Sequence, residues 1–467
     1  MGMQPLLLLP EILLFAAGLV VLLSGSFLPR RRQWVTRIVA AAALIASAVV
    51  GATAMVGPTQ MAMQGAFTID VATGVARVAA SLGTLIVVAL ASDEIQGTAR
   101  ESETYALLLF STAGTLVMAG AQDLLVVAVG FLLASIPLYG LIGIARTPAG
   151  AEAAMKTYLL GALFGIVLLG GITLLYGVSA TSAYPELTQS LVTAPDGAVA
   201  AGVVAVLMGL LFKAGGVPGH FWVPDAAQGA QGAVAAFLTT VPKIGAMIAI
   251  FRIVDLLPTT LAWPLLVAVL ATASMTLGNL AAYWQTDPRR LLGWSTVSQV
   301  GYLLVPVAVA GIVDSALPAL LFYLAGYTVT NLAAFAVTTA FPRHRSLESY
   351  RGMGRAHPWV GAALVVALLG LVGTPPTAVF VGKLTTTIAA WDGALAWLAV
   401  VVFVNSLASL FYYLRWIAPV YGSGESIHRS VFGAVTPGRW SVITAIVTAG
   451  LSLVIGLGAG VLWGALD

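Results

Sequence analysis

Long apolar segments alternate with short polar connections along the whole chain. The apolar segments lie at about 5–28, 36–56, 71–91, 104–120, 122–145, 156–177, 197–238, 241–256, 262–283, 290–311, 316–340, 359–391, 395–418 and 439–465. A helix that crosses the hydrocarbon core of a membrane takes about 20 residues, so the pattern predicts about fourteen transmembrane helices. The segments are continuously apolar rather than alternating, which argues against a membrane β-barrel. The predicted fold class is an all-α polytopic membrane protein.

Composition supports this fold class and excludes several kinds of function. Hydrophobic residues make up 60% of the 467 residues and charged residues only 8%, whereas a soluble domain carries about 25% charged residues. The mean hydropathy is +0.99. A net charge of +3 is too small to indicate nucleic-acid binding. The absence of cysteine excludes disulfides, iron–sulfur ligation and thiolate catalysis by this chain.

The distribution of arginine predicts how the helices are oriented in the membrane. With the N-terminus outside, the connections on the cytoplasmic side carry Arg30, Arg31, Arg32, Arg37, Arg100, Arg146, Arg289, Arg290, Arg343, Arg345, Arg351, Arg355, Arg429 and Arg439. The opposite connections carry Asp70, Glu186, Asp196, Asp314 and Asp392. Because Lys and Arg concentrate in cytoplasmic loops, this pattern predicts that both termini lie on the outer side.

Two of the apolar segments contain helix-breaking residues at membrane depth. The breakers are Gly215, Gly216 and Pro218 in the seventh segment, and Gly373, Pro375 and Pro376 in the twelfth. Paired interrupted helices are typical of transporters built from inverted repeats. The repeats would be helices 4–8 and helices 9–13. The predicted units are residues 1–103 with helices 1–3, 104–256 with the first repeat, 262–420 with the second, and 421–467 with helix 14.

The four lysines lie where the arginines do not. Lys213 precedes the first break, Lys243 follows at the start of the predicted helix 8, and Lys383 follows the second break. A charge at a helix centre costs about 2.5–3.5 kcal/mol, and a buried lysine, unlike an arginine, can lose its proton. These three lysines are therefore predicted to carry protons. Lys156 lies near the cytoplasmic edge, where it can instead reach the interface with its long side chain.

A few uncharged or weakly basic residues accompany the lysines. His220 lies in the first break and is a candidate proton relay or a structural histidine. Gln299 and Tyr302, in segment 290–311, can hold water along a proton path or pack between helices. Asp225 is predicted to cap the second half of helix 7. No residue pattern predicts a metal site or a cofactor bound by this chain.

Several motifs together resemble the antiporter-like membrane subunits of respiratory complex I, which are related to Mrp-type cation/proton antiporters. The motifs are LLPEILL around Glu11, AAMKTYLLGALFGIVLLGGITLLYG at 153–177, LLFKAGGVPGHFWVPDAAQGA at 210–230, AFLTTVPKIG at 236–245, RRLLGWSTVSQVGYLL at 289–304, GTPPTAVFVGK at 373–383 and NSLASLFYYLRWI at 405–417. The chain is most similar to the N-type members of this family, because its length leaves no room for the additional spans of the L-type.

The resemblance implies a function in proton translocation. In this family a hydrated axis runs in the membrane plane, from a glutamate on helix 5 through lysines on helices 7, 8 and 12, which correspond to Lys213, Lys243 and Lys383. NADH, flavin, iron–sulfur clusters and quinone would bind to partner subunits and not to this chain. The expected partners are the other membrane subunits of a complex I-like assembly, in a bacterial cytoplasmic membrane.

The chain departs from the family pattern at two positions. The helix 5 motif VGFLLASIPLYGL, at 129–141, has Leu132 where the family has its glutamate, and Gln299 stands where the family has a histidine. Lys213 would then favour its neutral form. Three functions remain open at this point: a proton-pumping subunit of a redox complex, a subunit of an Mrp-type antiporter or another energy-converting complex, and a scaffold with a weakened first half-channel.

Overall fold

The structure is a computed structural model that describes all residues except 1–2, 54, 259–261, 423–435 and 467. Its first helices are α1 (Leu9–Phe27), α2 (Trp34–Thr53), α3 (Val71–Ile95), α4 (Glu101–Gly120), α5 (Leu124–Gly143), α6 (Pro148–Ser179), α7 (Tyr184–Ser190), α8 (Asp196–Ala214), α9 (Trp222–Gly229) and α10 (Gly232–Asp255). The remaining helices are α11 (Trp263–Tyr283), α12 (Pro288–Val307), α13 (Ala316–Ala340), α14 (Met353–Ala356), α15 (Pro358–Val372), α16 (Ala378–Asp392), α17 (Ala396–Tyr421), α19 (Arg439–Leu457) and α20 (Ala459–Trp463).

The described part of the chain is almost entirely helical, and its helices suit a membrane. Eleven of the described helices are long and apolar enough to cross one, and α15 is a shorter apolar helix. A small hairpin of β1 (Gln60–Ala62) and β2 (Phe67–Ile69) precedes α3. The predicted all-α membrane fold is confirmed. The count of fourteen spans, the inverted relation of the repeats and the boundaries of the four units stay predictions.

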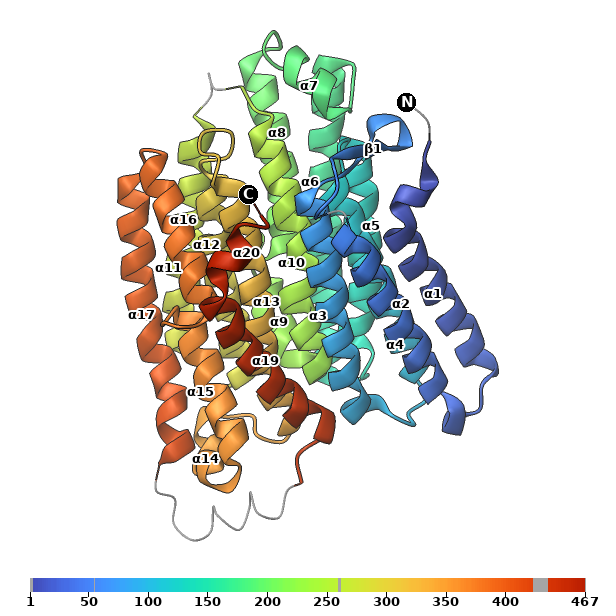
Figure 1. Ribbon diagram of the computed structural model, residues 1–467, viewed down its shortest axis with the longest axis vertical. Coiled ribbons are helices and arrows are strands. Elements are labelled where there is room, and N and C mark those ends of the chain that lie inside the picture. The colour runs from blue at the N-terminus through green and yellow to red at the C-terminus, as the bar shows by residue number, and fades with distance from the viewer. Residues whose placement is uncertain (1–2, 54, 259–261, 423–435, 467) are drawn as a thin grey trace.

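Helices α10 and α13 form the centre of the bundle, as Figure 1 shows. The apolar length of α10 is buried on all sides, and α10 packs against α3, α4, α8, α9, α12 and α13. Helix α13 in turn packs against α12, α15, α16 and α19. The two predicted repeats therefore meet along the contact between α10 and α13, and the chemistry described below lies around that contact.

The structure corrects the boundary between the predicted helices 7 and 8. The second half of helix 7 is only the short α9, and α10 begins at Gly232, not near residue 241. Pro242 lies inside α10 and does not end it, because helices packed against neighbours in a membrane tolerate an interior proline. Lys243 therefore lies halfway along a buried helix. The last predicted span, 439–465, is also divided, into α19 and the short α20.

The arginine-rich connections gather at one end of the bundle. Figure 1 shows α14 at the end opposite β1 and α7. Arg345, in the connection before α14, pairs with Asp287 at the start of α12. This grouping agrees with the side assigned to these connections from the charge pattern. Arg429 lies outside the described residues, as does part of the predicted 421–467 unit.

Two ion pairs fix the N-terminal helices to each other and to the central helix. Glu11 of α1 receives two hydrogen bonds from Arg77 of α3, both at 2.9 Å, and both side chains are buried. Asp70 caps α3 and pairs with Arg252 of α10 at 2.8 Å. Burial raises the pKa of Asp70, but the charge and hydrogen bond of Arg252 outweigh it, so that the pKa lies below the ordinary value of 3.8.

Candidate functional site

The first helix break places a free carbonyl next to a lysine. Helix α8 ends at Ala214, and Gly215 follows in the left-handed conformation with φ 83°. A side chain at Gly215 would come within 2.6 Å of Val223, so the turn needs glycine. The last carbonyls of a helix have no partner within it. Here Lys243 Nζ of α10 donates to the Ala214 carbonyl at 2.7 Å.

Lys213 lies just before this break and makes a different contact. Its Nζ donates to Ser135 Oγ of α5 at 3.0 Å, and its side chain is buried. Leu132, the position of the family glutamate, lies one turn earlier on α5 but on its outer face, where it is 43% exposed. Ser135 is therefore the polar partner that α5 gives to Lys213.

The second break repeats this construction. Helix α15 ends at Val372, and Gly373 follows with φ 91°. Lys383 Nζ of α16 donates to the carbonyls of Leu371 at 3.3 Å and Val372 at 2.9 Å, and to Ser406 Oγ of α17 at 3.2 Å. It also lies 3.9 Å from the centre of the Tyr302 ring, within the range of a cation–π contact.

The three lysines are alike in burial and in lacking a counter-charge, and Lys243 and Lys383 also share a helix-end carbonyl as hydrogen-bond acceptor. Each is buried, and none has an ion-pair partner among the residues that the structure describes. Carbonyls at a helix C-terminus carry partial negative charge and favour a nearby cation. They hold an ammonium without the full charge of a carboxylate. Such a site can both accept a proton and release it, whereas a buried carboxylate pair resists the loss of either charge.

The remaining predicted residues divide between the two breaks. Gln299 and Tyr302 lie beside Lys383: Gln299 Nε2 donates to the Leu371 carbonyl at 2.8 Å. His220 lies in the first break against the rings of Phe221 and Trp294. His220 is buried, and its Nδ1 has no hydrogen-bond partner in the described part of the chain. A buried polar atom without a partner is a place where water binds.

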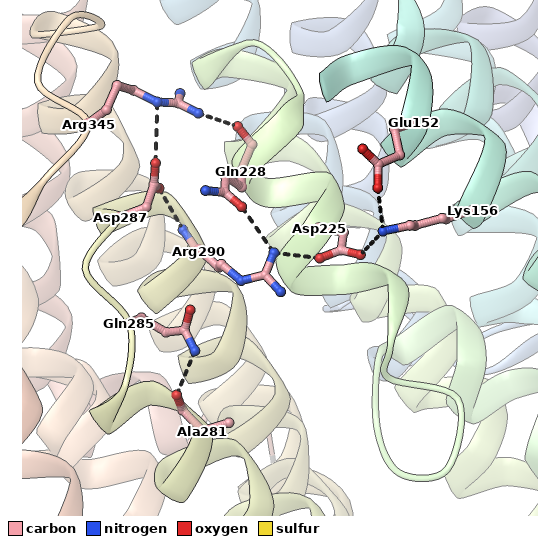
Figure 2. Close-up of polar contacts among 9 residues, drawn as sticks. All are labelled: Glu152, Lys156, Asp225, Gln228, Ala281, Gln285, Asp287, Arg290 and Arg345. Carbon is pink, nitrogen blue, oxygen red and sulfur yellow. Dashed lines mark hydrogen bonds and ion pairs between the residues drawn. The ribbon is translucent and has the colours of Figure 1, made fainter. Parts of the chain in front are cut away.

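Lys156 lies apart from the other lysines, in an exposed polar cluster shown in Figure 2. It pairs with Glu152 at 2.7 Å and with Asp225 at 3.0 Å. Asp225 also pairs with Arg290 of α12 at 2.5 Å. These residues line a cavity of about 390 Å³. The prediction that Asp225 caps α9 was wrong: its carboxylate joins α6 to α12, and α9 has no side-chain cap.

Sequence reasoning did not single out three hydroxyl-bearing residues that bond near the breaks or between the central helices. Ser135 bonds Lys213, Tyr323 of α13 donates to Gln299 Oε1 at 2.6 Å, and Tyr327 of α13 donates to the Thr239 carbonyl of α10 at 2.8 Å. Isolated hydroxyls inside apolar runs look the same whether they face lipid or the interior. Only their packing separates the two cases.

Within the described ranges, no group of three or more His, Cys, Asp or Glu side chains could hold a metal ion.

Comparison with known families shows to which family this helical bundle belongs. Residues 121–409 match the model of the transmembrane family described as NADH:quinone oxidoreductase/Mrp antiporter. The chain belongs to this family. The matched range contains both breaks and all four lysines.

Relatives in this family match the chain over nearly its whole length. The NADH-quinone oxidoreductase subunit N of Mycobacterium sp. (strain JLS) is 62% identical, with 99% of this chain and 98% of the relative covered. The NADH-quinone oxidoreductase subunit N 1 of Streptomyces griseus is 47% identical, with 100% and 99% covered.

Solved structures agree with this placement in the family. A chain of respiratory complex I from Thermus thermophilus with bound Aureothin is 30% identical, with a TM-score of 0.83 and 98% and 99% of the two chains covered. A chain of the Mrp complex from Dietzia sp. is 25% identical, with a TM-score of 0.84 and 100% and 96% covered. Both branches of the family thus share this fold.

Proposed function

We propose that the chain is the N-type, proton-translocating membrane subunit of a complex I-type NADH-quinone oxidoreductase. The two relatives at 62% and 47% identity both bear the name subunit N. In this proposal NADH, flavin, iron–sulfur clusters and quinone bind to partner subunits, and this chain contributes no redox site. Its partners are the other membrane subunits of the complex.

The observation that carries the proposal is the pair of lysine–carbonyl contacts at the helix breaks. Lys243 and Lys383 each meet a free helix carbonyl inside the bundle, without a carboxylate partner among the described residues. Broken helices with their ends aimed at a charged group are the usual construction of an ion site in a transporter. A lysine in such a site gains and loses a proton while its surroundings stay in place.

The proposed path runs from Lys213 through Lys243 to Lys383. Gln299 and Tyr302 line the path at the second break, and His220 binds water of the path at the first break. Lys156 lies at the mouth of the path, where the polar cavity of Figure 2 opens among charged groups that attract water. The chain would sit in a bacterial cytoplasmic membrane with both termini on the outer side, as the arginine pattern predicts.

Two other functions, an Mrp-type exchanger and a scaffold subunit, predict different properties of the chain. An Mrp-type exchanger would pump without redox input, but the relative of that type is only 25% identical. A scaffold would retain the fold with an inactive path, and Leu132 favours such weakening in the first half. The lysine contacts at both breaks argue against a fully inactive path.

The deciding experiment uses the native complex in vesicles. Its other subunits are identified after purification, and NADH-driven proton uptake is measured for Lys243→Met and Lys383→Met. We expect pumping to fall by at least tenfold, because proton transfer by a positioned group contributes about 10²–10⁴-fold. Gln285→Met, which removes a polar side chain whose hydrogen bond goes to Ala281 of its own segment, is the control for a substitution outside the path. Retained pumping in both buried-lysine variants would make the chain a scaffold.

A further inference from the structure

A crevice of about 340 Å³ opens where α1, α4 and α5 meet, near the connections that precede α4 and follow α5. Helices α1 and α5 each pack against α4, and residues of all three line the crevice. Figure 1 shows α1 at the outer edge of the bundle. The crevice therefore lies on the flank of the molecule, away from the central helices and from the lysines of the proposed path.

The two ends of the crevice differ in polarity. At its mouth, Arg100 comes directly before α4, and Arg146 follows the end of α5. Leu107 of α4 lies seven residues after Arg100, about 10 Å further along the helix axis. Leu22 of α1 and Gly140 of α5 line the same deeper part, since a side chain at Gly140 would lie 3.5 Å from Leu107 Cδ1. The crevice thus has a basic mouth and an apolar depth.

The positive charge at the mouth is not neutralised within the described part of the chain. Neither Arg100 nor Arg146 has an ion-pair or hydrogen-bond partner for its guanidinium among the described residues. Glu103 also lines the crevice, but its carboxylate accepts from Ser102 at 3.2 Å and forms no ion pair in these residues. Two arginines against one carboxylate leave the mouth with a net positive charge.

A phosphate group fits the mouth, and an acyl chain fits the depth. Guanidinium groups bind phosphate oxygens through charge-assisted hydrogen bonds. Basic pockets between transmembrane helices on the cytoplasmic side bind the head groups of anionic lipids, and the charge pattern assigns Arg100 and Arg146 to that side. Inorganic phosphate would contact only the mouth, whereas a phospholipid uses both parts of the crevice.

The size of the crevice favours a lipid over a helix of a partner subunit. One turn of an α-helix, about 10 Å wide and about 5.4 Å long, fills about 420 Å³, which is more than the crevice holds. An extended acyl chain is much narrower. Leu23 of α1 and Ile136 of α5, near the lining residues Leu22 and Gly140, are exposed and apolar. An acyl chain that leaves the crevice therefore continues along an apolar surface.

We propose that this crevice binds an anionic phospholipid of the cytoplasmic leaflet. Its phosphate lies between Arg100 and Arg146, and one acyl chain runs past Leu107 and Gly140. The bound phosphate joins the connection before α4 to the connection after α5. The inference rests on the fold and its placement in a membrane and does not depend on proton translocation by the chain.

Photo-crosslinking in the native complex tests this site. The purified complex is reconstituted into phosphatidylcholine vesicles that contain phosphatidylglycerol with a diazirine in one acyl chain, and the labelled peptides are identified by mass spectrometry. We expect labels around Leu107 and Gly140. A phosphatidylcholine probe with the same diazirine should label these positions at least about fivefold less, because each basic residue near the membrane surface strengthens the binding of anionic lipid by about fivefold.

Variants separate the mouth from the depth of the crevice. Arg100→Gln with Arg146→Gln should lower the labelling by about 25-fold, two factors of about fivefold. The matched control, Arg30→Gln with Arg31→Gln, removes the same charge from the connection after α1, which does not line the crevice, and should leave the labelling unchanged. Gly140→Leu fills the depth while both arginines remain and should also lower the labelling several-fold. This variant decides the question if the double arginine variant does not assemble.

Competition identifies the ligand. Unlabelled phosphatidylglycerol should reduce the labelling, whereas inorganic phosphate should not, and equal competition by inorganic phosphate would replace the lipid site by a simple anion site. Equal labelling by the two probes would mean that ordinary bilayer lipid covers the crevice, and no labelling by either probe would mean that a partner subunit covers it. Each of these three results overturns the proposal. None involves proton uptake, so the proposed function is tested separately.

Discussion

Lys243 donates its hydrogen bond to the carbonyl of Ala214, so a side chain of α10 completes the broken end of α8. The distance of 2.7 Å is that of a strong charge-assisted bond. Any change that moves either end of this contact alters both the break and the lysine. The glycine that follows Ala214 is the most direct way to test this dependence.

Replacement of Gly215 by alanine should distort the first break. The left-handed conformation costs a non-glycine residue about 1–2 kcal/mol. The new Cβ would also lie 2.6 Å from Val223 Cγ2 and 3.2 Å from Lys243 Nζ. We expect a lower melting temperature of the purified complex and slower proton uptake. Gly197→Ala is the control, because nothing lies within 4 Å of its Cβ, and equal effects of the two variants would refute the prediction.

Removal of the Ser135 hydroxyl should weaken proton transfer through Lys213. Ser135→Ala leaves a buried amine without its partner, at a cost of about 1–3 kcal/mol. Proton uptake should fall several-fold while the amount of assembled complex stays the same. Ser111→Ala is a matched control, since Ser111 is also buried and bonds only to a backbone carbonyl of α5, that of Ala134. Normal pumping by Ser135→Ala would show that this contact has no part in the path.

The ion pair between Asp70 and Arg252 should give a pH-dependent contribution to stability. The pKa of Asp70 lies below its ordinary value of 3.8 in the folded protein. The pair therefore stabilises the fold fully above that value, and the contribution is lost as the pH falls through the lowered pKa. Asp70→Asn should cost about 2 kcal/mol near neutral pH.

Melting curves of the complex between pH 3 and pH 7 check this prediction. The difference in melting temperature between Asp70→Asn and the unmodified chain should shrink at the acid end. Asp314→Asn, which removes an exposed carboxylate without an ion pair in the described residues, should show little difference at any pH. A difference for Asp70→Asn that does not change with pH would contradict the assigned sign.

The buried pair of Glu11 and Arg77 should be far more sensitive to loss of one partner than of both. Glu11→Gln leaves a buried guanidinium without its counter-charge, which costs about 3–5 kcal/mol. The double variant Glu11→Leu with Arg77→Met replaces the pair by apolar groups and should recover most of that loss. Thermal melting of the complex measures both. A double variant less stable than Glu11→Gln would mean that the pair itself stabilises the fold.

The elements and the breaks follow from local sequence signals. Long apolar runs can be read directly, and Gly215 and Gly373 mark the ends of α8 and α15 because each residue needs a positive φ. The start of α10 could not be predicted from such local sequence signals. The apolar segments placed a boundary near residue 241, but neighbouring helices hold α10 continuous through Pro242, and that packing is a property of the folded bundle.

The lysines of the site could be predicted from the sequence, whereas most of its hydroxyl-bearing side chains could not. A lysine in an apolar run costs enough energy to attract attention, which is why Lys213, Lys243 and Lys383 could be named. Tyr323 and Tyr327 lie in an equally apolar run, and nothing local indicates that their hydroxyls point toward α12. Long-range contacts between helices decide that orientation.

The depth of the lysines in the membrane determines which steps of proton transfer require work against the transmembrane voltage. Lys243 lies halfway along α10, and Lys383 lies beside the break between α15 and α16. A proton that passes between them in the proposed path moves mainly in the plane of the bilayer. Electrical work, about 2.3 kcal/mol per charge for each 100 mV, is done only on displacement across the membrane. The transmembrane voltage would therefore oppose entry and exit and leave the central transfer almost untouched.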